Sequence, residues 1–314
     1  MKILFGAYDY ALGGFMGLMK KELPQHEFQD SGRCRIESLK GFDVLLPIMN
    51  PVSRELLDSG DCLRLIQQCG AGLESVDIHA ARGKNIWVAN VPTDISGNAD
   101  SVAELGIYLM VGLARDFRKM AHSIKNRQFG FPGRALSGKT VGLVGIGGIG
   151  RAMARRLKAF DVHLIGIKRH NLQETKEDLG LEWVGTPDDM KEFLGRADYV
   201  ILCLPVTPES RNLINQQTLN EMKQNAFLIN LSRGGLVDRD ALEEALAMGK
   251  IAGAGLDVFW EEPPDPDDSI FQYNVMATPH IAGATDISIR GILKVVVENI
   301  RRLERGEVPL YLKN

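Results

Sequence analysis

Short apolar runs alternate with longer amphipathic stretches along almost the whole chain. Each run spans roughly 4 to 8 residues, the length expected of strands that are buried on both faces of a parallel sheet. Helical patterns lie between these runs, for example at Ile149–Phe160 and Arg239–Met248. The alternation predicts an α/β fold with right-handed crossovers. The predicted strands are Lys2–Ala7, Asp43–Ile48, Leu63–Cys69, Thr140–Ile146, Val162–Ile167, Tyr199–Leu204, Phe227–Leu231, Ala254–Val258 and Val275–Thr278.

Two helical patterns are longer than the others, Ala99–Arg127 and Ile287–Arg305. A chain of 314 residues has room for about two domains. We therefore predict two sheets. One is built from residues 1–98 and completed by 285–314, and the other is built from residues 99–284.

Composition narrows the classes of function. Lys and Arg total 37 against 40 Asp and Glu, so the basic excess of a nucleic-acid binder is missing. The longest uncharged helical stretch, Leu105–Ala114, is about half of a bilayer span, and Ile3–Tyr8 is too short for a signal-peptide core. The four cysteines form no CxxC pair, which favours reduced thiols. We expect a cytoplasmic protein that binds neither membrane nor nucleic acid, and no His or Cys spacing predicts a metal site.

The strongest local signal is a glycine-rich turn, Gly145, Gly147 and Gly150, between an apolar strand and a helix. In the pattern G-x-G-x-x-G, the first glycine permits a tight turn and the second lets a pyrophosphate approach the backbone. The third allows close packing of helix and strand. The N–H groups of Gly148 and Ile149 then face the anion at the start of the helix. The turn predicts a dinucleotide site in the second domain.

The next strand ends in Lys168-Arg169-His170, and no carboxylate follows until Glu174. Enzymes that use NAD usually have an acidic residue here to bind the ribose hydroxyls, whereas a basic residue pairs with a 2′-phosphate. Lys168 and Arg169 therefore predict NADP(H), with NAD(H) as the alternative. The alternative to any cofactor contact is an exposed basic turn that touches no ligand.

Three charged residues follow predicted strands in the second half of the chain: Arg233 after FLINLS, Glu262 after GLDVFW and His280 after VMATP. Ligands of open α/β sheets bind beyond the carboxyl ends of strands, so these three side chains could converge on one crevice. Taken singly, each residue type is more often a surface or turn residue.

The sequence motifs around these residues resemble the signatures of the D-isomer-specific 2-hydroxyacid dehydrogenases. They are N-L-S-R-G-G-L-V-D (230–238), G-L-D-V-F-W-E-E-P (255–263) and T-P-H-I-A-G (278–283). The glycine turn, G-A-G-L-E-S-V-D (70–77) and L-P-V-T (204–207) resemble further segments of that family, in the same order. The length is similar to that of its short form, which includes glyoxylate and hydroxypyruvate reductases.

The resemblance implies two Rossmann-like or flavodoxin-like α/β domains with parallel sheets and an active-site cleft between them. Residues 1–98 with 285–314 would form the substrate domain, and residues 99–284 the dinucleotide-binding domain. It also implies a homodimer formed largely through the cofactor domains, including the helix Ala99–Arg127.

The resemblance further implies a role for each matching residue. Arg233 would clamp the carboxylate and carbonyl of the substrate. His280 would protonate the carbonyl oxygen as hydride arrives, and Glu262 would orient the imidazole. Backbone groups of Ala71 and Gly72 would bind the substrate carboxylate. The dinucleotide would contact Gly148, Ile149, Pro205, Thr207, the carbonyl of Leu231 and, at the nicotinamide amide, Asp257.

The expected activity is that of an NAD(P)-dependent oxidoreductase acting on CH–OH groups, which reduces a small 2-oxoacid such as glyoxylate or hydroxypyruvate to the D-2-hydroxyacid. A phosphoglycerate or phosphite dehydrogenase remains an alternative, and a dinucleotide-sensing corepressor is a further one. Glu262, where formate dehydrogenases carry Gln, argues against formate as the substrate. The short stretch after Gly283 leaves no room for a regulatory domain, which disfavours the amino-acid-inhibited form of phosphoglycerate dehydrogenase.

Overall fold

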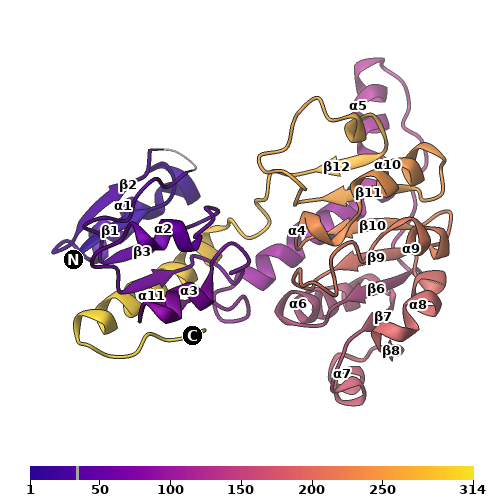
Figure 1. Cartoon of the computed structure of the whole chain (residues 1–314). Coiled ribbons are helices and arrows are strands. Elements are labelled where there is room, and N and C mark those ends of the chain that lie inside the picture. Colours follow the sequence, from indigo (N-terminus) through magenta and orange to yellow (C-terminus); the bar gives the residue numbers. More distant parts are fainter. Residues whose placement is uncertain (33–34) are drawn as a thin grey trace. The chain divides into compact units, whose positions relative to one another are not determined.

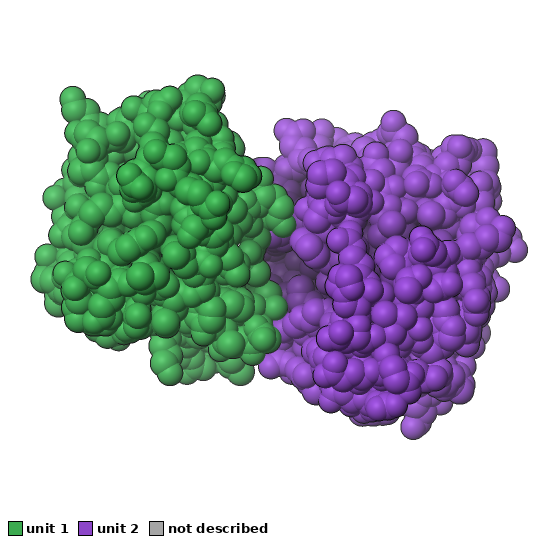
Figure 2. Space-filling model, turned by 60° about the horizontal axis from the view of Figure 1, so that its bottom comes forward, with its two compact units in different colours: residues 1–98, 284–314 green, residues 99–283 purple. Residues whose placement is uncertain are grey.

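Two parallel sheets organise the chain, whose computed structural model describes residues 1–32 and 35–314. Each sheet belongs to a compact unit of its own (Figures 1 and 2). Unit 1 comprises residues 1–98 and 284–314, and unit 2 comprises residues 99–283. The predicted fold class, two α/β domains with parallel sheets, is confirmed.

Unit 1 contains a five-stranded sheet in the order β2-β1-β3-β4-β5, with every neighbouring pair parallel. This is the flavodoxin-like strand order. Its strands are β1 (Lys2–Phe5), β2 (Glu27–Asp30), β3 (Val44–Leu46), β4 (Leu65–Gln67) and β5 (Trp87–Ala89). Its helices are α1 (Ala11–Glu22), α2 (Arg54–Asp58), α3 (Ile78–Gly83) and α11 (Asp286–Glu304), the last returning from the end of the chain to the N-terminal strands (Figure 1).

The alternation of side chains along the strands of unit 1 fills two apolar layers. Ile3 and Phe5 of β1 point to the layer that α1 and α11 cover, where they pack with Phe15 and Val296. Leu4 points to the opposite layer, which α2 and α3 cover. Because both faces are covered, the strands read as continuous apolar runs in the sequence.

Unit 2 contains a seven-stranded parallel sheet in the order β12-β11-β10-β9-β6-β7-β8. The chain builds outward from β6 through β7 to β8 and then crosses back to β9 on the other side of β6. That reversal is the topological switch point at which dinucleotides bind in such sheets. The strands are β6 (Thr140–Val144), β7 (His163–Ile167), β8 (Trp183–Gly185), β9 (Tyr199–Leu202), β10 (Phe227–Asn230), β11 (Gly253–Leu256) and β12 (Val275–Ala277).

Helices cover both faces of this sheet. One apolar layer includes α4 and α6, and the other includes α8, α9 and α10. The helices of unit 2 are α4 (Asn98–Ala114, which starts at the boundary between the units), α5 (Phe117–Lys125), α6 (Gly148–Leu157), α7 (Leu172–Leu179), α8 (Met190–Arg196), α9 (Gln216–Glu221) and α10 (Arg239–Ala247).

The sequence pattern did not predict three of the strands, β2, β5 and β8. Each lies at the edge of its sheet. An edge strand is short and partly solvated, so it lacks the long apolar run that identifies a central strand. β2 illustrates this, because exposed and half-buried residues alternate along it.

The prediction of one helix over Ala99–Arg127 is wrong. α4 ends at Ala114 and α5 begins at Phe117. Between them Asp116 adopts a left-handed backbone with φ of 52°, and its carboxylate accepts a hydrogen bond of 3.2 Å from the Lys119 N–H. This side-chain cap starts a new helix in a new direction, although the apolar spacing continues across the break.

The described residues hold free thiols at Cys62, Cys69 and Cys203, while Cys34 lies outside them. Over the same part of the chain, no helix combines the length and the apolar character that a membrane crossing requires.

Candidate active site

The candidate residues of unit 2 all lie just beyond the carboxyl ends of its strands. Since these strands run parallel, the ends share one edge of the sheet. The glycine turn follows β6, Lys168 and Arg169 follow β7, Pro205 and Thr207 follow β9, Leu231 and Arg233 follow β10, Asp257 follows β11, and His280 follows β12.

The side chains of His280 and Glu262 are joined by a hydrogen bond. The imidazole Nδ1 lies 2.7 Å from Oε2 of Glu262, and the other oxygen, Oε1, accepts the Phe259 N–H at 3.0 Å. Burial by itself would raise the pKa of Glu262. The hydrogen bonds from His280 and Phe259, together with the charges of His280 and Arg233, outweigh burial and lower this pKa. The pair therefore holds the imidazole in a defined orientation through Nδ1.

The backbone at His280 is held in the left-handed region, with φ of 53°. Its N–H is shared between the carbonyls of Asp257 (2.8 Å) and Thr278 (3.0 Å). A non-glycine residue adopts this conformation at an energetic cost, so the surrounding hydrogen bonds must impose it.

Asp257 supplies most of those hydrogen bonds. Its side chain is only 1% exposed, and Oδ1 accepts from the Thr278 hydroxyl at 2.7 Å and the Ile281 N–H at 2.9 Å. The Ala282 N–H donates to both carboxylate oxygens, at 3.2 and 3.1 Å. Burial raises the pKa of Asp257, although these hydrogen bonds oppose it. Asp257 thus fixes the turn that carries His280, while its contact with a nicotinamide amide stays a prediction.

Arg233 stands in a turn that a buried asparagine shapes. The amide of Asn230 donates to the Arg233 carbonyl at 2.8 Å, and its oxygen accepts the Ser232 N–H at 3.1 Å. The guanidinium Nη1 donates to the Ser232 carbonyl at 2.7 Å. Asn230 is 1% exposed, so these bonds satisfy an amide that would be costly to bury unpaired.

Gly234 allows the Arg233 turn to touch the segment that leads to Glu262. A Cβ atom at this position would lie 2.0 Å from the carbonyl oxygen of Phe259. Asn230 and Gly234 are functional candidates that the residue-type reasoning missed. The available signal was a polar residue at the last position of an apolar strand, followed by a glycine pair directly after the Arg.

The glycine turn has the geometry that a dinucleotide pyrophosphate requires. Gly145 has φ of 89°, and a Cβ on Gly150 would lie 2.3 Å from the Gly145 carbonyl oxygen. Apart from its two chain neighbours, no described residue has a heavy atom within 4 Å of the Cβ position of Gly147, the residue that precedes α6, and the Gly147 position offers no side-chain cap to this helix. The start of α6 thus offers backbone N–H groups and open space to an anion. These residues fit a nicotinamide dinucleotide.

The two basic residues after β7 differ in their surroundings. The ammonium of Lys168 donates to the Thr175 hydroxyl at 2.8 Å, whereas Arg169 is exposed. After β9, the buried Ser210 donates to the Pro205 carbonyl at 2.9 Å and accepts the Thr207 N–H at 2.7 Å, so it shapes that loop. The cofactor contacts of these residues and of Leu231 stay predictions.

The loop with Ala71 and Gly72 belongs to unit 1, after β4. The side chain of Asn90 donates to the Ala71 carbonyl at 2.7 Å, and that of Gln68 donates to the Gly72 carbonyl at 3.0 Å. Two side chains thus fix the loop, and its contact with a substrate carboxylate stays a prediction. Within residues 1–32 and 35–314, no group of His, Cys, Asp and Glu is arranged to hold a metal ion.

Comparison with known proteins finds one matching family model and many relatives. Residues 107–282 match the model described as D-isomer specific 2-hydroxyacid dehydrogenase, NAD binding domain. A glyoxylate reductase of Thermococcus litoralis is 36% identical over 290 residues, covering 89% of this chain and 86% of the relative. A D-3-phosphoglycerate dehydrogenase of Methanocaldococcus jannaschii is 36% identical over 302 residues, or 95% of this chain. The chain spans only 54% of that longer protein.

Solved structures show the same architecture. The NADPH-dependent glyoxylate/hydroxypyruvate reductase of Sinorhizobium meliloti, in complex with NADP and malonate, matches with a TM-score of 0.84 and 27% identity. The match covers 99% of this chain and 96% of that one.

Replacing Glu262 by Gln is expected to destabilise unit 2 in a pH-dependent way. Folding lowers the pKa of Glu262, so the unfolded chain binds this proton more readily. The stabilisation is fully present above the ordinary pKa of 4.5 and is lost as the pH falls through the lowered value. We expect Glu262→Gln to cost about 1–2 kcal/mol near pH 6 and progressively less as the pH falls below 4.5, measured by urea unfolding of the whole chain. The exposed neighbour Glu261→Gln is the control, and an equal cost at every pH would contradict the argument.

Proposed function

The chain belongs to the D-isomer specific 2-hydroxyacid dehydrogenase family, and on this premise we propose that it reduces a small 2-oxoacid to the D-2-hydroxyacid. Membership makes it an oxidoreductase that acts on CH–OH groups and binds a nicotinamide cofactor. The observation that carries the proposal is the Glu262–His280 pair, held at the same sheet edge as Arg233 and the glycine turn.

Each charged residue has one task in the proposed reaction. Arg233 binds the substrate carboxylate and carbonyl, for which the planar guanidinium is suited. When bound, the reduced nicotinamide supplies a hydride to the carbonyl carbon. His280 donates the proton on Nε2 to the carbonyl oxygen, since Nδ1 is engaged by Glu262. Glu262 keeps the ring oriented through Nδ1, so Arg233, Glu262 and His280 act as one set.

Glyoxylate and hydroxypyruvate are the proposed substrates. In support, the relative from Thermococcus litoralis is named glyoxylate reductase, and the Sinorhizobium meliloti enzyme is named for both acids. The relative named D-3-phosphoglycerate dehydrogenase supports phosphoglycerate as the second candidate.

NADP(H) is the proposed cofactor, and Arg169 is its main determinant. Arg169 is exposed after β7, whereas Lys168 is bonded to Thr175. An exposed guanidinium pairs well with a 2′-phosphate. The Sinorhizobium meliloti enzyme was solved with NADP, which supports the same choice.

A homodimer is the proposed assembly, and the cytoplasm is the proposed location. Exposed apolar side chains gather on α4, on α5 and on the loop after α5, as a contact with a second copy would require. They are Tyr108, Val111, Phe117, Met120, Ile124, Phe129 and Phe131. Free thiols at Cys62, Cys69 and Cys203 favour a reducing compartment.

The first experiment is an assay of NADPH and NADH oxidation with glyoxylate, hydroxypyruvate, pyruvate and phenylpyruvate. We expect turnover with a small 2-oxoacid, and His280→Ala should lower kcat by about 100-fold or more while cofactor binding is retained. Arg233→Ala should raise KM and lower kcat together. The exposed His163→Ala is the control. Absence of turnover with every acid would reject the proposal and direct the search to phosphoglycerate, phosphite and a binding-only role.

Cofactor preference is expected to depend on Arg169. Replacing it by Ala removes a charge-assisted contact with the 2′-phosphate, so kcat/KM with NADPH should fall about 10- to 100-fold. The value with NADH should stay nearly unchanged, and replacing the half-buried Arg196 by Ala should alter neither value. A parent enzyme whose kcat/KM with NADH equals or exceeds its kcat/KM with NADPH would overturn the NADP(H) assignment.

Light scattering at working concentration should give the mass of a dimer. Ile124 is 80% exposed, so a charge there is tolerated by the isolated chain but not by an apolar interface. We therefore expect Ile124→Glu to shift the mass toward that of a monomer, and Met248→Glu, at an exposed position beyond α10, to leave it unchanged. A parent chain that is monomeric would reject the assembly.

A further inference from the structure

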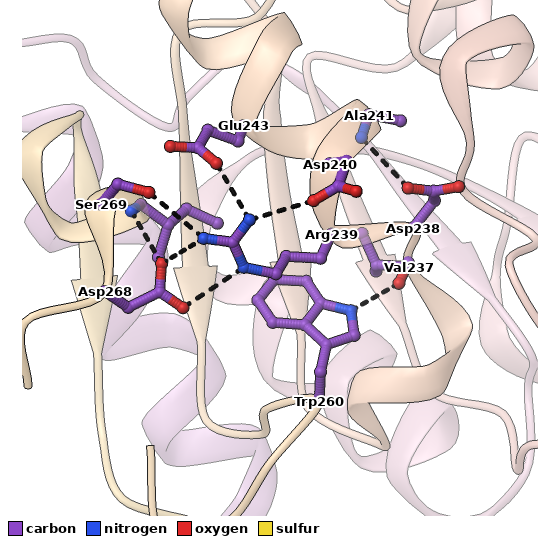
Figure 3. Close-up of polar contacts among 10 residues, drawn as sticks. Val237, Asp238, Arg239, Asp240, Ala241, Glu243, Trp260, Asp268 and Ser269 are labelled. Carbon is purple, nitrogen blue, oxygen red and sulfur yellow. Dashed lines mark hydrogen bonds and ion pairs between the residues drawn. The ribbon is translucent and has the colours of Figure 1, made fainter. Parts of the chain in front are cut away.

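An ionic cluster surrounds Arg239, the first residue of α10, outside the set of side chains assigned to the reaction (Figure 3). Its Nη2 and Nε bond to the two oxygens of Asp268, at 2.5 and 3.3 Å. Nη1 donates to Asp240 and to Glu243, each at 3.0 Å, and Nη2 also reaches the Ser269 hydroxyl at 3.2 Å. Every nitrogen of the guanidinium is thus used.

One cation in this cluster serves three carboxylates, those of Asp240, Glu243 and Asp268. The hydrogen bond from Arg239 holds the pKa of Asp268 below its usual range. Apart from the guanidinium, the Asp268 carboxylate accepts the Ile270 N–H at 3.0 Å, and it faces two like charges on α10. The orientation of the Asp268 carboxylate toward α10 therefore depends on Arg239.

Asp268 in turn ends the segment that carries Glu262. Between the two acids lie Pro263, Pro264 and Pro266, and the ring of each proline fixes a backbone angle. A displacement of Asp268 is consequently passed along a stiff, largely exposed stretch to Glu262.

The near end of the same segment is fastened independently. The indole N–H of Trp260 donates to the Val237 carbonyl at 2.6 Å, and Phe259 packs against Gly234 (Figure 3 shows the Trp260 bond). Glu262 therefore lies between two contacts, that of Trp260 with Val237 and that of Asp268 with Arg239. Val237 and Arg239 both belong to the segment that leads from the Arg233 turn into α10.

We propose that Arg239 is a positioning residue for the reaction: by holding Asp268 it keeps the Glu262 carboxylate on Nδ1 of His280. The kinetic part of this inference rests on the proposed 2-oxoacid reductase function. The turn after Asp268 has its own support, because Ile270 is fully buried and the guanidinium of Arg118 donates to the carbonyls of Phe271, Gln272 and Tyr273. Loss of Arg239 thus releases the Glu262 side and leaves the fold in place.

The test compares Arg239→Gln with Asp268→Asn, which retains a side chain able to cap the turn at Ser269. Each variant should lower kcat about 10-fold, because a displaced orienting group misaligns the proton donor. KM for the cofactor should be unchanged, and the pH profile of kcat should differ from that of the parent. Arg239→Lys keeps the positive charge but lacks the two-pronged guanidinium, so its kcat should lie between that of Arg239→Gln and that of the parent. The double variant should be no worse than Arg239→Gln, since both changes break one contact.

Arg305→Gln is the matched control. Arg305 also binds two carboxylates, Glu298 and Glu307, but it belongs to unit 1. The Arg305→Gln substitution should change the melting temperature without changing the pH profile of kcat.

Two NMR signals test the inference without turnover: the indole N–H of Trp260 and the ring of His280. In folded Arg239→Gln, the ring signals of His280 should move from their positions in the parent at one fixed pH, because the carboxylate on Nδ1 is displaced, while the Trp260 signal persists. Unchanged His280 ring signals together with an unchanged kcat would overturn the proposal, as would a pH-profile change that Arg305→Gln reproduces. If the parent reduces no 2-oxoacid, the proposed function fails, and the His280 ring signals still decide the positioning role of Arg239.

Discussion

All seven strands of unit 2 run in one direction, and the candidate site depends on this constraint. Parallel strands bring their carboxyl ends to one edge, so segments far apart in sequence deliver side chains to a common place. The glycine turn follows β6 and His280 follows β12. Local sequence near either segment carries no trace of the other, and only the sheet places both on the same edge.

Buried polar side chains then convert that shared edge into a defined geometry. Asp257 and Asn230 are each 1% exposed, and their oxygens and amide bond to the backbone of the turns that carry His280 and Arg233. A buried polar group is tolerated only when its hydrogen bonds are satisfied, so each of these residues permits few conformations of its turn. The left-handed backbone of His280 is a direct result.

The connections between turns form the next level of organisation. Gly234 brings the Arg233 turn against Phe259, Trp260 bonds to Val237, and Arg239 holds Asp268. Consequently, the segment with Glu262 is tied to the segment with Arg233 at both ends. Such ties explain how a loop of exposed acids and prolines can hold a carboxylate in register with an imidazole.

The sequence by itself determined the α/β class, the central strands and the glycine turn, because apolar periodicity and turn chemistry are local properties. It pointed to Arg233, Glu262 and His280 through the resemblance of the surrounding segments to a known family. It missed the edge strands β2, β5 and β8, whose partial exposure hides them, and it joined α4 to α5 because apolar spacing continues across the break at Asp116. The roles of Asn230, Gly234 and Arg239 were decided by tertiary structure alone. Each of these residues contacts either a segment that folding brings close or a turn whose conformation depends on the fold. Such distances cannot be read from a pattern of residues along the chain.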